Sequence, residues 1–305
     1  MKIKYLTRKD ISDELWNAAV EADTGGYPYA FTFYLDAVAP DWSALVIGNY
    51  ESVFPLPFNS KIPFFKQVYP PHFSQRLGLF GPPNQKCLTT ELLNAIPKEF
   101  KKVHLKVSDF PEGKDWAVKK RLNLELDLNT PYQETYKGYS KSLAKKIKKA
   151  KKHLIVKESN DIDGLIQLYK NKQGQRIGLS LNDYKRAALL FESLLKRQKG
   201  KLLEVVDENE DVLCFGFFPI TTSRIVNLFS AATEKGRDLA ARPLMINYLI
   251  ESYSGRNYIF DFEGSELPGV YEFFKSFGPK ERYYYEIEKG QFPFPFQIFK
   301  RIFLK

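Results

Sequence analysis

Cysteine and histidine are scarce in this chain. Among its 305 residues there are two cysteines, Cys87 and Cys214, and three histidines. The cysteines lie too far apart in the sequence for a disulfide framework or a cysteine metal site, and His72, His104 and His153 lack the close pairing of a zinc site. We therefore expect a reducing compartment and predict no metal site.

Long apolar runs are also missing. No stretch of about 18 apolar residues is present, as a membrane-spanning helix would require. The first residues, MKIKYLTRKDISDELW, hold no continuous apolar run of the kind found in a secretory signal. No G-x-S-x-G motif marks a hydrolase nucleophile. These absences favour a cytoplasmic protein.

Positive charge, in contrast, is concentrated in two segments. The net charge is +10, from 46 basic and 36 acidic residues. The segment KGYSKSLAKKIKKAKK, residues 137–152, holds eight lysines and no acid, and without it 38 basic residues face 36 acidic ones. The ending QFPFPFQIFKRIFLK adds Lys300, Arg301 and Lys305 without an acid. An anionic partner is therefore expected at these two segments rather than over the whole surface.

Length and composition predict two folded domains. A hydrophobic fraction of 44% and an aromatic fraction of 15% argue against global disorder. The strand, turn and strand pattern of residues 43–58 recurs in residues 201–220, which indicates a tandem repeat of one unit. In the second half the apolar spacing predicts a helix beneath the lysines, strands over 201–206, 212–220 and 225–230, a helix over 239–253, a strand over 258–262 and a helix over 269–277.

This order of elements predicts an α+β (mixed α/β) fold in which helices flank a mixed sheet. We assign residues 1–129 to an N-terminal domain, 130–289 to a C-terminal domain with the active site, and 290–305 to a basic aromatic tail. The tail either acts as an interfacial anchor, which would hold the protein at the inner face of a membrane, or packs back on a domain.

Three segments of the second half together resemble a known family. They are YSKSLAKKIKKAKK (139–152), LFSAATEKGRDLAARPLM (228–245) and DFEGSELPGVYEFFKSFG (261–278). They resemble the FemAB/FemX-type peptidyltransferases of the GCN5-related N-acetyltransferase (GNAT) superfamily. The resemblance implies two tandem GNAT-like domains, each a mixed, mostly antiparallel sheet flanked by helices. It also implies transfer of an acyl or aminoacyl group to an amine, which FemX-type enzymes perform with aminoacyl-tRNA and peptidoglycan precursor peptides.

One departure from the superfamily concerns the acyl donor. Members that use acetyl-CoA hold its pyrophosphate on a Q/R-x-x-G-x-G/A turn at a helix N-terminus. Here the corresponding run is Arg237-Asp238-Leu239-Ala240-Ala241, so Ala240 stands where the first glycine is expected. The substitution fits a donor other than acyl-CoA, such as aminoacyl-tRNA. An acetyl-CoA-dependent N-acetyltransferase is the alternative.

Amide formation needs a base for the attacking amine and a group that stabilises the oxyanion. Asp261 and Glu263 lie two positions apart on the expected strand, so their side chains would point to one face beside Gly264 and Ser265. We predict that both carboxylates are catalytic and that Ser265 binds substrate. The alternative is that they order the glycine loop.

Basic residues supply the other site candidates. Lys275 matches the lysine of the family's F-K-x-x-F-G segment, which implies a contact with a phosphate or with the oxyanion; the alternative is a surface lysine at a helix end. Arg237 and Arg242, near the beginning of the 239–253 helix, are candidate phosphate contacts. In the first domain, Gln75 and Arg76 are candidate contacts for the acceptor.

The lysine helix has three interpretations. Lys145, Lys149 and their neighbours could bind the phosphates of tRNA or of a lipid pyrophosphate, or lie against an anionic membrane. The third interpretation is a solvated helix face. Like charges four residues apart destabilise a helix, so we favour an anionic partner over a purely structural role.

The predicted function is an acyltransferase that joins an activated acyl or aminoacyl group to a small-molecule or lipid-linked amine acceptor. A binding module that holds RNA or anionic lipid without catalysis is the rival. Convergence of Glu263, Lys275 and Arg237 on one cavity would favour the enzyme, and their dispersal would favour the binding module. The sequence does not predict the oligomeric state.

Overall fold

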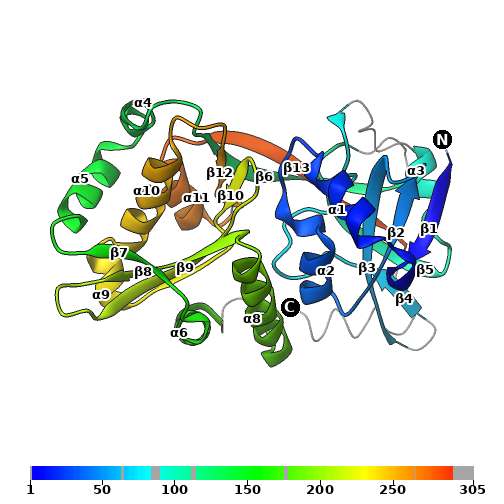
Figure 1. Ribbon diagram of the computed structural model, residues 1–305, viewed down its shortest axis with the longest axis horizontal. Coiled ribbons are helices and arrows are strands. Elements are labelled where there is room, and N and C mark those ends of the chain that lie inside the picture. Colours follow the sequence, from blue (N-terminus) through cyan, green and yellow to red (C-terminus); the bar gives the residue numbers. More distant parts are fainter. Residues whose placement is uncertain are drawn as a thin grey trace. The chain divides into compact units, whose positions relative to one another are not determined.

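The computed structural model describes residues 2–62, 65–83, 90–110, 115–174, 178–264 and 266–290 (Figure 1). The helices are α1 (Asp13–Glu21), α2 (Thr32–Val38), α3 (Thr90–Asn94), α4 (Tyr132–Lys137), α5 (Lys141–Ala150), α6 (Ile162–Tyr169), α8 (Leu181–Lys196), α9 (Glu234–Asp238), α10 (Ala241–Tyr253) and α11 (Pro268–Lys275), with short turns η1 (Arg8–Asp10), η2 (Pro28–Ala30) and η4 (Lys170–Gly174). The strands are β1 (Ile3–Thr7), β2 (Asp41–Ile47), β3 (Ser52–Ile62), β4 (Phe65–Val68), β5 (Phe100–Val107), β6 (Ala117–Asp127), β7 (Ile155–Ser159), β8 (Gly200–Val206), β9 (Val212–Pro219), β10 (Arg224–Val226), β11 (Phe229–Ala232), β12 (Ile259–Asp261) and β13 (Lys280–Lys289). In this part of the chain no helix is long and apolar enough to cross a membrane.

The chain packs into two compact units. Unit 1 comprises residues up to Thr24, then Tyr29–Arg121, and the described residues from Tyr283 onward; unit 2 comprises Gly25–Pro28 and Leu122–Arg282. The units are therefore not two consecutive halves of the sequence. The predicted domain boundaries at residues 129 and 289 do not coincide with the two units found from packing. They stay predictions.

Unit 1 holds a mixed sheet in the order β1-β2-β3-β4-β5-β13. All neighbours are antiparallel except β4 and β5, which are parallel. Its apolar residues, among them Phe54, Leu56 and Leu105, form a core with α3.

Unit 2 holds an antiparallel sheet, β11-β9-β8-β7, and a second group in which β12 pairs with β6 antiparallel and with β10 parallel. Because side chains alternate along a strand, β9 presents Gly216 to Met245 of α10 and Phe217 to Leu194 and Phe191 of α8. Helices therefore cover both faces of this sheet, with α10 and α5 on one face and α6 and α8 on the other (Figure 1).

The two units repeat one order of elements. In unit 1 a strand, two helices, an antiparallel pair, a further strand, a helix and a parallel strand run from β1 to β5. In unit 2 the series from β7 to β12 is similar, but two strands, β10 and β11, stand in place of the further strand and two helices, α9 and α10, in place of the single helix. The strand after the first series, β6, pairs with β12 inside unit 2, and the strand after the second series, β13, pairs with β5 inside unit 1. The predicted fold class, tandem units of mixed and mostly antiparallel sheet with flanking helices, is confirmed.

The predicted elements of the second half are present, with two corrections. The strand expected over 225–230 is two strands, β10 and β11, because the chain changes sheets at Asn227 and Leu228. The strand expected over 258–262 ends at Asp261, and Glu263 lies beyond it with a left-handed φ of 55°. The alternation that would point Asp261 and Glu263 to one face therefore does not apply, because it holds only within an extended strand.

The lysine helix forms for identifiable local reasons. The Ser140 side chain caps α5 by accepting a hydrogen bond from the Leu143 N–H, at 3.2 Å. Leu143, Ile147 and Ala150 recur at helical intervals and are buried in the unit 2 core. Burial of this stripe compensates for the repulsion between the lysines on the other faces.

Candidate functional site

In unit 2 the strands β11 and β12 lie apart and leave a gap. The parallel pair β10 and β12 stays together up to the hydrogen bond from the Asn227 N–H to the Asp261 carbonyl, 2.8 Å long. Beyond this bond β11 pairs with β9, whereas the Phe262 N–H bonds to Leu124 of β6. The strands β11 and β12 thus separate, which leaves one edge of β11 without a partner strand in the described residues.

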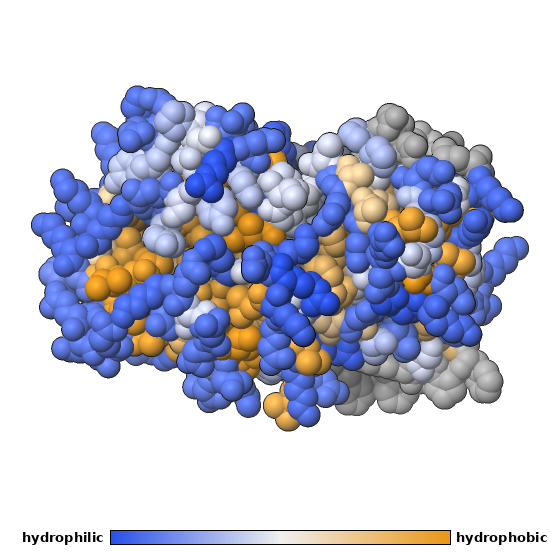
Figure 2. Space-filling view, viewed as in Figure 1, coloured by the Kyte–Doolittle hydropathy of each residue, from blue (hydrophilic) through white to orange (hydrophobic). Residues whose placement is uncertain are grey.

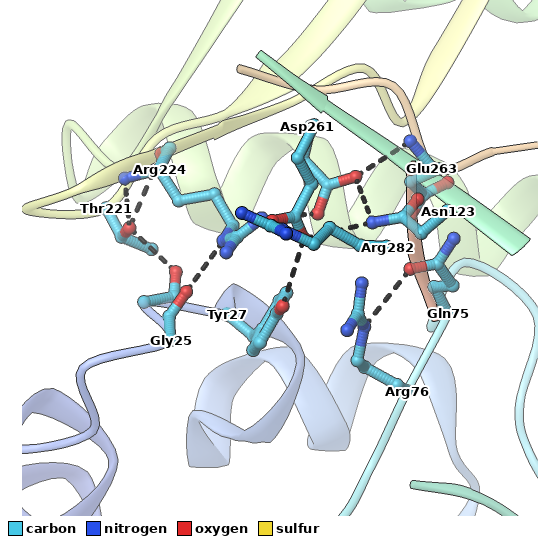
Figure 3. Close-up of polar contacts among 12 residues, drawn as sticks. Gly25, Tyr27, Gln75, Arg76, Asn123, Thr221, Arg224, Asp261, Glu263 and Arg282 are labelled. Atoms are coloured by element: carbon cyan, nitrogen blue, oxygen red, sulfur yellow. Dashed lines mark hydrogen bonds and ion pairs between the residues drawn. The ribbon is translucent and has the colours of Figure 1, made fainter. Parts of the chain in front are cut away.

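Asp261 lies at the base of this gap inside a buried charge cluster (Figure 3). Its carboxylate accepts hydrogen bonds from the Arg224 guanidinium at 2.7 Å, from the Asn123 amide at 3.0 Å and from the Glu263 N–H at 2.9 Å. Arg224 also donates to Glu125 at 3.0 Å. Burial opposes the Arg224 charge, but the carboxylates outweigh it and raise the pKa of this guanidinium.

This geometry favours the structural alternative for Asp261. The side chain is fully buried and holds the backbone of Glu263 in place, so it orders the loop after β12. A catalytic role for Asp261 stays a prediction. The burial of its carboxylate argues against that role. Glu263 differs, because it is only partly buried and has a strained backbone, which costs on the order of 1–2 kcal/mol outside glycine.

Two predicted site residues meet at Tyr169, the last residue of α6. The Tyr169 ring stacks on Phe229 of β11 with centroids 3.6 Å apart. Burial raises the pKa of its hydroxyl to about 12; the Arg242 charge acts against this rise and the Glu263 carboxylate adds to it. Arg242 and Glu263 therefore both lie close enough to the Tyr169 hydroxyl to affect its pKa. No ion pair joins the two residues in the described part of the chain.

Arg242 reaches from the first turn of α10 to β11. Its Nε donates to the Ser230 hydroxyl at 2.9 Å, and its Nη2 donates to the Ser230 carbonyl at 3.1 Å. Desolvation lowers the pKa of this arginine. We call Tyr169, Asn227, Ser230, Arg242 and Glu263 the strand-gap cluster.

A groove follows one side of α5. A depression of about 570 Å³ lies between α5, α10 and α11 and is lined by Lys146, Pro243, Phe273 and Lys275 among others. Lys146 also lines a smaller depression beside Ala240, together with Lys149. Lys149 in turn lines a third depression of about 320 Å³. Neighbouring depressions share a lining lysine, and we call the three depressions together the α5 groove.

The lysines of α5 have no acidic partner in the part of the chain that the structure describes. Over the described residues none of them forms an ion pair; these are Lys141, Lys145, Lys146, Lys148 and Lys149. The rim of the molecule where Figure 1 draws α5 is covered by hydrophilic residues in Figure 2. Lys149 faces the groove as predicted for a binding residue, while Lys145 is exposed on a neighbouring side of the helix and lines none of the three depressions.

Lys275 lies at the first depression, at the end of α11. The Ser140 N–H bonds to the Ser276 carbonyl at 2.8 Å, which ties the end of α11 to the beginning of α5. The Lys275 ammonium donates to the Tyr271 hydroxyl at 2.7 Å, and this bond raises the pKa of Lys275. A charged group therefore faces the groove across neutral pH.

The other predicted site residues lie elsewhere. Arg237 is exposed on α9 and its guanidinium lies 3.7 Å from Glu234. Gln75 and Arg76 belong to unit 1, where both are buried and the Arg76 Nε donates to the Gln75 side-chain oxygen at 3.2 Å. Ser265, Cys87 and the tail beyond residue 290 lie outside the described residues, so their predicted roles stay predictions.

None of the described depressions brings Glu263, Lys275 and Arg237 together, which is the outcome that favours the binding module. The depression that Lys275 lines contains neither Glu263 nor Arg237 among its described residues. It does contain Pro243 and Phe273, and Phe273 lies 5.9 Å from the Arg242 guanidinium. The α5 groove and the strand-gap cluster thus adjoin through Arg242 rather than through Arg237.

Ala240 keeps the backbone form of the glycine it replaces. It precedes α10 with φ 58° and ψ 41°, a left-handed conformation that glycine adopts most easily. Its side chain is buried in the unit 2 core. The turn therefore keeps a left-handed conformation with a methyl group on it.

A group that could ligate a metal lies in unit 1. The ligating atoms of His104, Glu286 and Glu288 all lie within 4.8 Å of one another. Arg121 donates to Glu286 at 2.6 Å, and Lys102 lies 3.3 Å from Glu288. Burial opposes the Glu286 charge, but Arg121 and His104 outweigh it and lower the pKa of Glu286. The carboxylates already have cationic partners, so we do not assign a metal here.

Comparison with known proteins identifies the fold. No family model matches the chain, and no curated protein matches it. The solved structure of FemX matches over 100% of both chains, with a TM-score of 0.68 at 14% identity. L-PGS from Bacillus licheniformis matches over 96% of both chains, with a TM-score of 0.56 at 14% identity. A tandem GNAT protein from the clavulanic acid biosynthesis pathway matches over 96% of this chain and 100% of its own, with a TM-score of 0.51 at 12% identity.

At these identities the likeness concerns the fold. The chain has the fold of the tandem GNAT-type aminoacyl and acyl transferases. Within that class its fold is FemX-like, as the sequence resemblance predicted.

Sequence reasoning missed four residues of the site, which are Lys146, Tyr169, Asn227 and Ser230. Lys146 joins two depressions, and its spacing of three from Lys149 and seven from His153 could have marked one face of the helix. Tyr169 and Asn227 carried no signal, because each becomes notable only when β11 separates from β12.

Proposed function

We propose that the protein is an acyltransferase that forms an amide between an aminoacyl group, delivered as aminoacyl-tRNA, and an amine acceptor such as a peptidoglycan or lipid-linked precursor. The observation that carries the proposal is the α5 groove, where Lys146 and Lys149 form no ion pair with the described residues although acids such as Glu272 and Asp238 also line the depressions, on a chain with a FemX-like fold. A polyanionic donor would supply a counter-charge for these lysines.

The reaction assigns a role to each part of the site. The acceptor nitrogen attacks the carbonyl carbon of the aminoacyl ester, a C–N bond forms, and the ester C–O bond breaks. The proton lost by the amine ends on the leaving ribose hydroxyl, so the atoms balance without a further reactant. Lys275 stabilises the oxyanion as it forms, and Glu263 carries the proton.

The test of this function is a transfer assay with the full chain. Labelled aminoacyl-tRNA and acyl-CoA are offered in parallel with peptidoglycan precursor and aminolipid acceptors. Amide product from aminoacyl-tRNA, absent with acyl-CoA, supports the proposal. Product from acyl-CoA alone would instead favour the N-acetyltransferase alternative. Tight tRNA binding without any product would favour the binding module, which the separation of Arg237 from Lys275 also favours.

The two groove lysines are expected to set the salt dependence of tRNA binding. In the Lys146→Ala/Lys149→Ala variant the slope of log affinity against log salt concentration falls by about 1 per lysine, because each phosphate contact releases counter-ions. Fluorescence anisotropy with labelled tRNA at four salt concentrations measures the slope.

Lys148→Ala is the matched control for these variants. Lys148 is exposed on the same helix but lines none of the three depressions. An equal loss of slope in the Lys148 variant would mean that α5 binds the polyanion through its whole exposed surface and not through the groove.

A further inference from the structure

Arg242 carries a charge that unit 2 does not neutralise. Its Nε and Nη2 donate to Ser230, and over the described residues the guanidinium forms no ion pair. The remaining positions of Leu122–Arg282, which are Gln175, Arg176, Ile177 and Ser265, include no acid. The Arg242 side chain is partly buried, and a partly desolvated charge without an acidic partner is unfavourable, so we expect a ligand to supply the counter-charge.

Two buried polar atoms of unit 2, on Asn227 and Tyr184, also have no hydrogen-bond partner among the described residues. The Asn227 side chain is 7% exposed, and its Oδ1 accepts no hydrogen bond in the described residues. Asn227 precedes Ser230 by three residues, so they lie within about 10 Å of each other along the chain. The Tyr184 hydroxyl, which acts on the same Tyr169 hydroxyl as Arg242 and Glu263, is likewise buried without a partner.

The charges around Tyr169 have opposite signs. The Glu263 carboxylate and the Arg242 guanidinium both act on its hydroxyl without touching each other. A ligand with an amine near one and an anionic group near the other would match this arrangement. The α5 groove already accounts for the phosphates of the donor, so the anionic group at Arg242 belongs to the acceptor.

We infer that Arg242 binds an oxyanion of the acceptor, either a carboxylate or a phosphate, while Asn227 Oδ1 accepts a hydrogen bond from an N–H of the same molecule. The acceptor class is therefore an amine that also carries an anionic group. This inference rests on the proposed transferase function, because it assigns the strand-gap cluster to the acceptor. Arg242 fixes the position of the amine and takes no part in proton transfer.

The test compares ligands that differ only in the anion. Ligand-observed NMR at constant ionic strength measures the Kd of glycylglycine beside glycylglycine amide, and of phosphoethanolamine beside ethanolamine. We expect the wild-type protein to bind at least one anionic member about tenfold more tightly than its match. The pair that shows the preference identifies the anion as a carboxylate or a phosphate.

Variants test whether Arg242 causes the preference for the anionic ligand. Arg242→Gln is expected to abolish it, and Arg242→Lys to retain part of it, because a lysine keeps the charge but loses the fork of donors. Ser230→Ala removes a hydroxyl that orients the guanidinium and weakens the preference in a protein that keeps the charge. Arg256→Gln, an exposed arginine beside Tyr253, is the control for the change in charge.

The outcomes separate this inference from the proposed function. No anion preference in the wild-type protein, or an equal preference after Arg242→Gln, overturns the inference even when aminoacyl transfer is observed. An anion preference that disappears with Arg242, in a protein that transfers nothing from aminoacyl-tRNA, supports the anion site and overturns the transferase.

Discussion

Replacing Arg224 by methionine is expected to lower the free energy of unfolding by about 3–5 kcal/mol, which is the cost of breaking a buried ion pair by removal of one partner. The substitution leaves Asp261 and Glu125 facing each other in the protein interior, where both accept hydrogen bonds from Arg224 at 2.7 and 3.0 Å. Urea unfolding followed by circular dichroism measures the loss.

The stability of the Arg224→Met variant is also expected to depend on pH. In the variant the folded protein takes up protons on these carboxylates more readily than the unfolded chain does, so its stability rises as the pH falls from about 7 toward 5.

Arg282→Met is the matched control for Arg224→Met. Arg282 lies at the exposed side of the same cluster, 4.0 Å from Glu125, with a side chain that is 57% exposed. Its removal is expected to cost less than about 1 kcal/mol, as for a surface pair. If both variants lost the same free energy of unfolding, Asp261 would not be held by a buried ion pair with Arg224.

Lys275→Ala is expected to lower the rate of amide formation by about 10²-fold or more, because an oxyanion would lose a charged donor. The affinity for tRNA should change much less, since the groove keeps Lys146 and Lys149. Single-turnover transfer with saturating aminoacyl-tRNA separates the two effects.

Lys280→Ala supplies the control for this rate. Lys280 is exposed at the beginning of β13 and lines none of the depressions of the α5 groove. Lys275→Arg retains a cation and should recover part of the rate. Unchanged turnover in a folded Lys275→Ala protein would remove this lysine from the chemistry and leave it as a surface residue.

The elements of unit 2 were largely predictable because they depend on local patterns. Apolar spacing marked α5, α10 and α11, and the polar turns between β8, β9 and the next strand marked the meander. The segment Asp261–Gly278 carried the family resemblance, and the fold comparison agrees with it.

The composition of the site was less predictable, because it depends on which strands separate. Asp261 and Glu263 seemed equivalent as neighbours on one strand, yet Asp261 is enclosed by Arg224 and Asn123 while Glu263 lies in a left-handed turn near Tyr169. Burial is a tertiary property, and two carboxylates two residues apart can differ completely in it.

By itself, the sequence determined that most of the positive charge is local, that α5 carries it, and that one α+β unit is repeated. Only the tertiary structure decided that β6 pairs with β12 and β13 with β5, that β11 leaves β12 after Asn227, and that Arg242 lies beside β11 with no carboxylate partner among the described residues. The reason is physical. Helix periodicity and charge runs are encoded by neighbours in the chain, whereas strand exchange, burial and charge compensation depend on residues that folding brings together from distant positions.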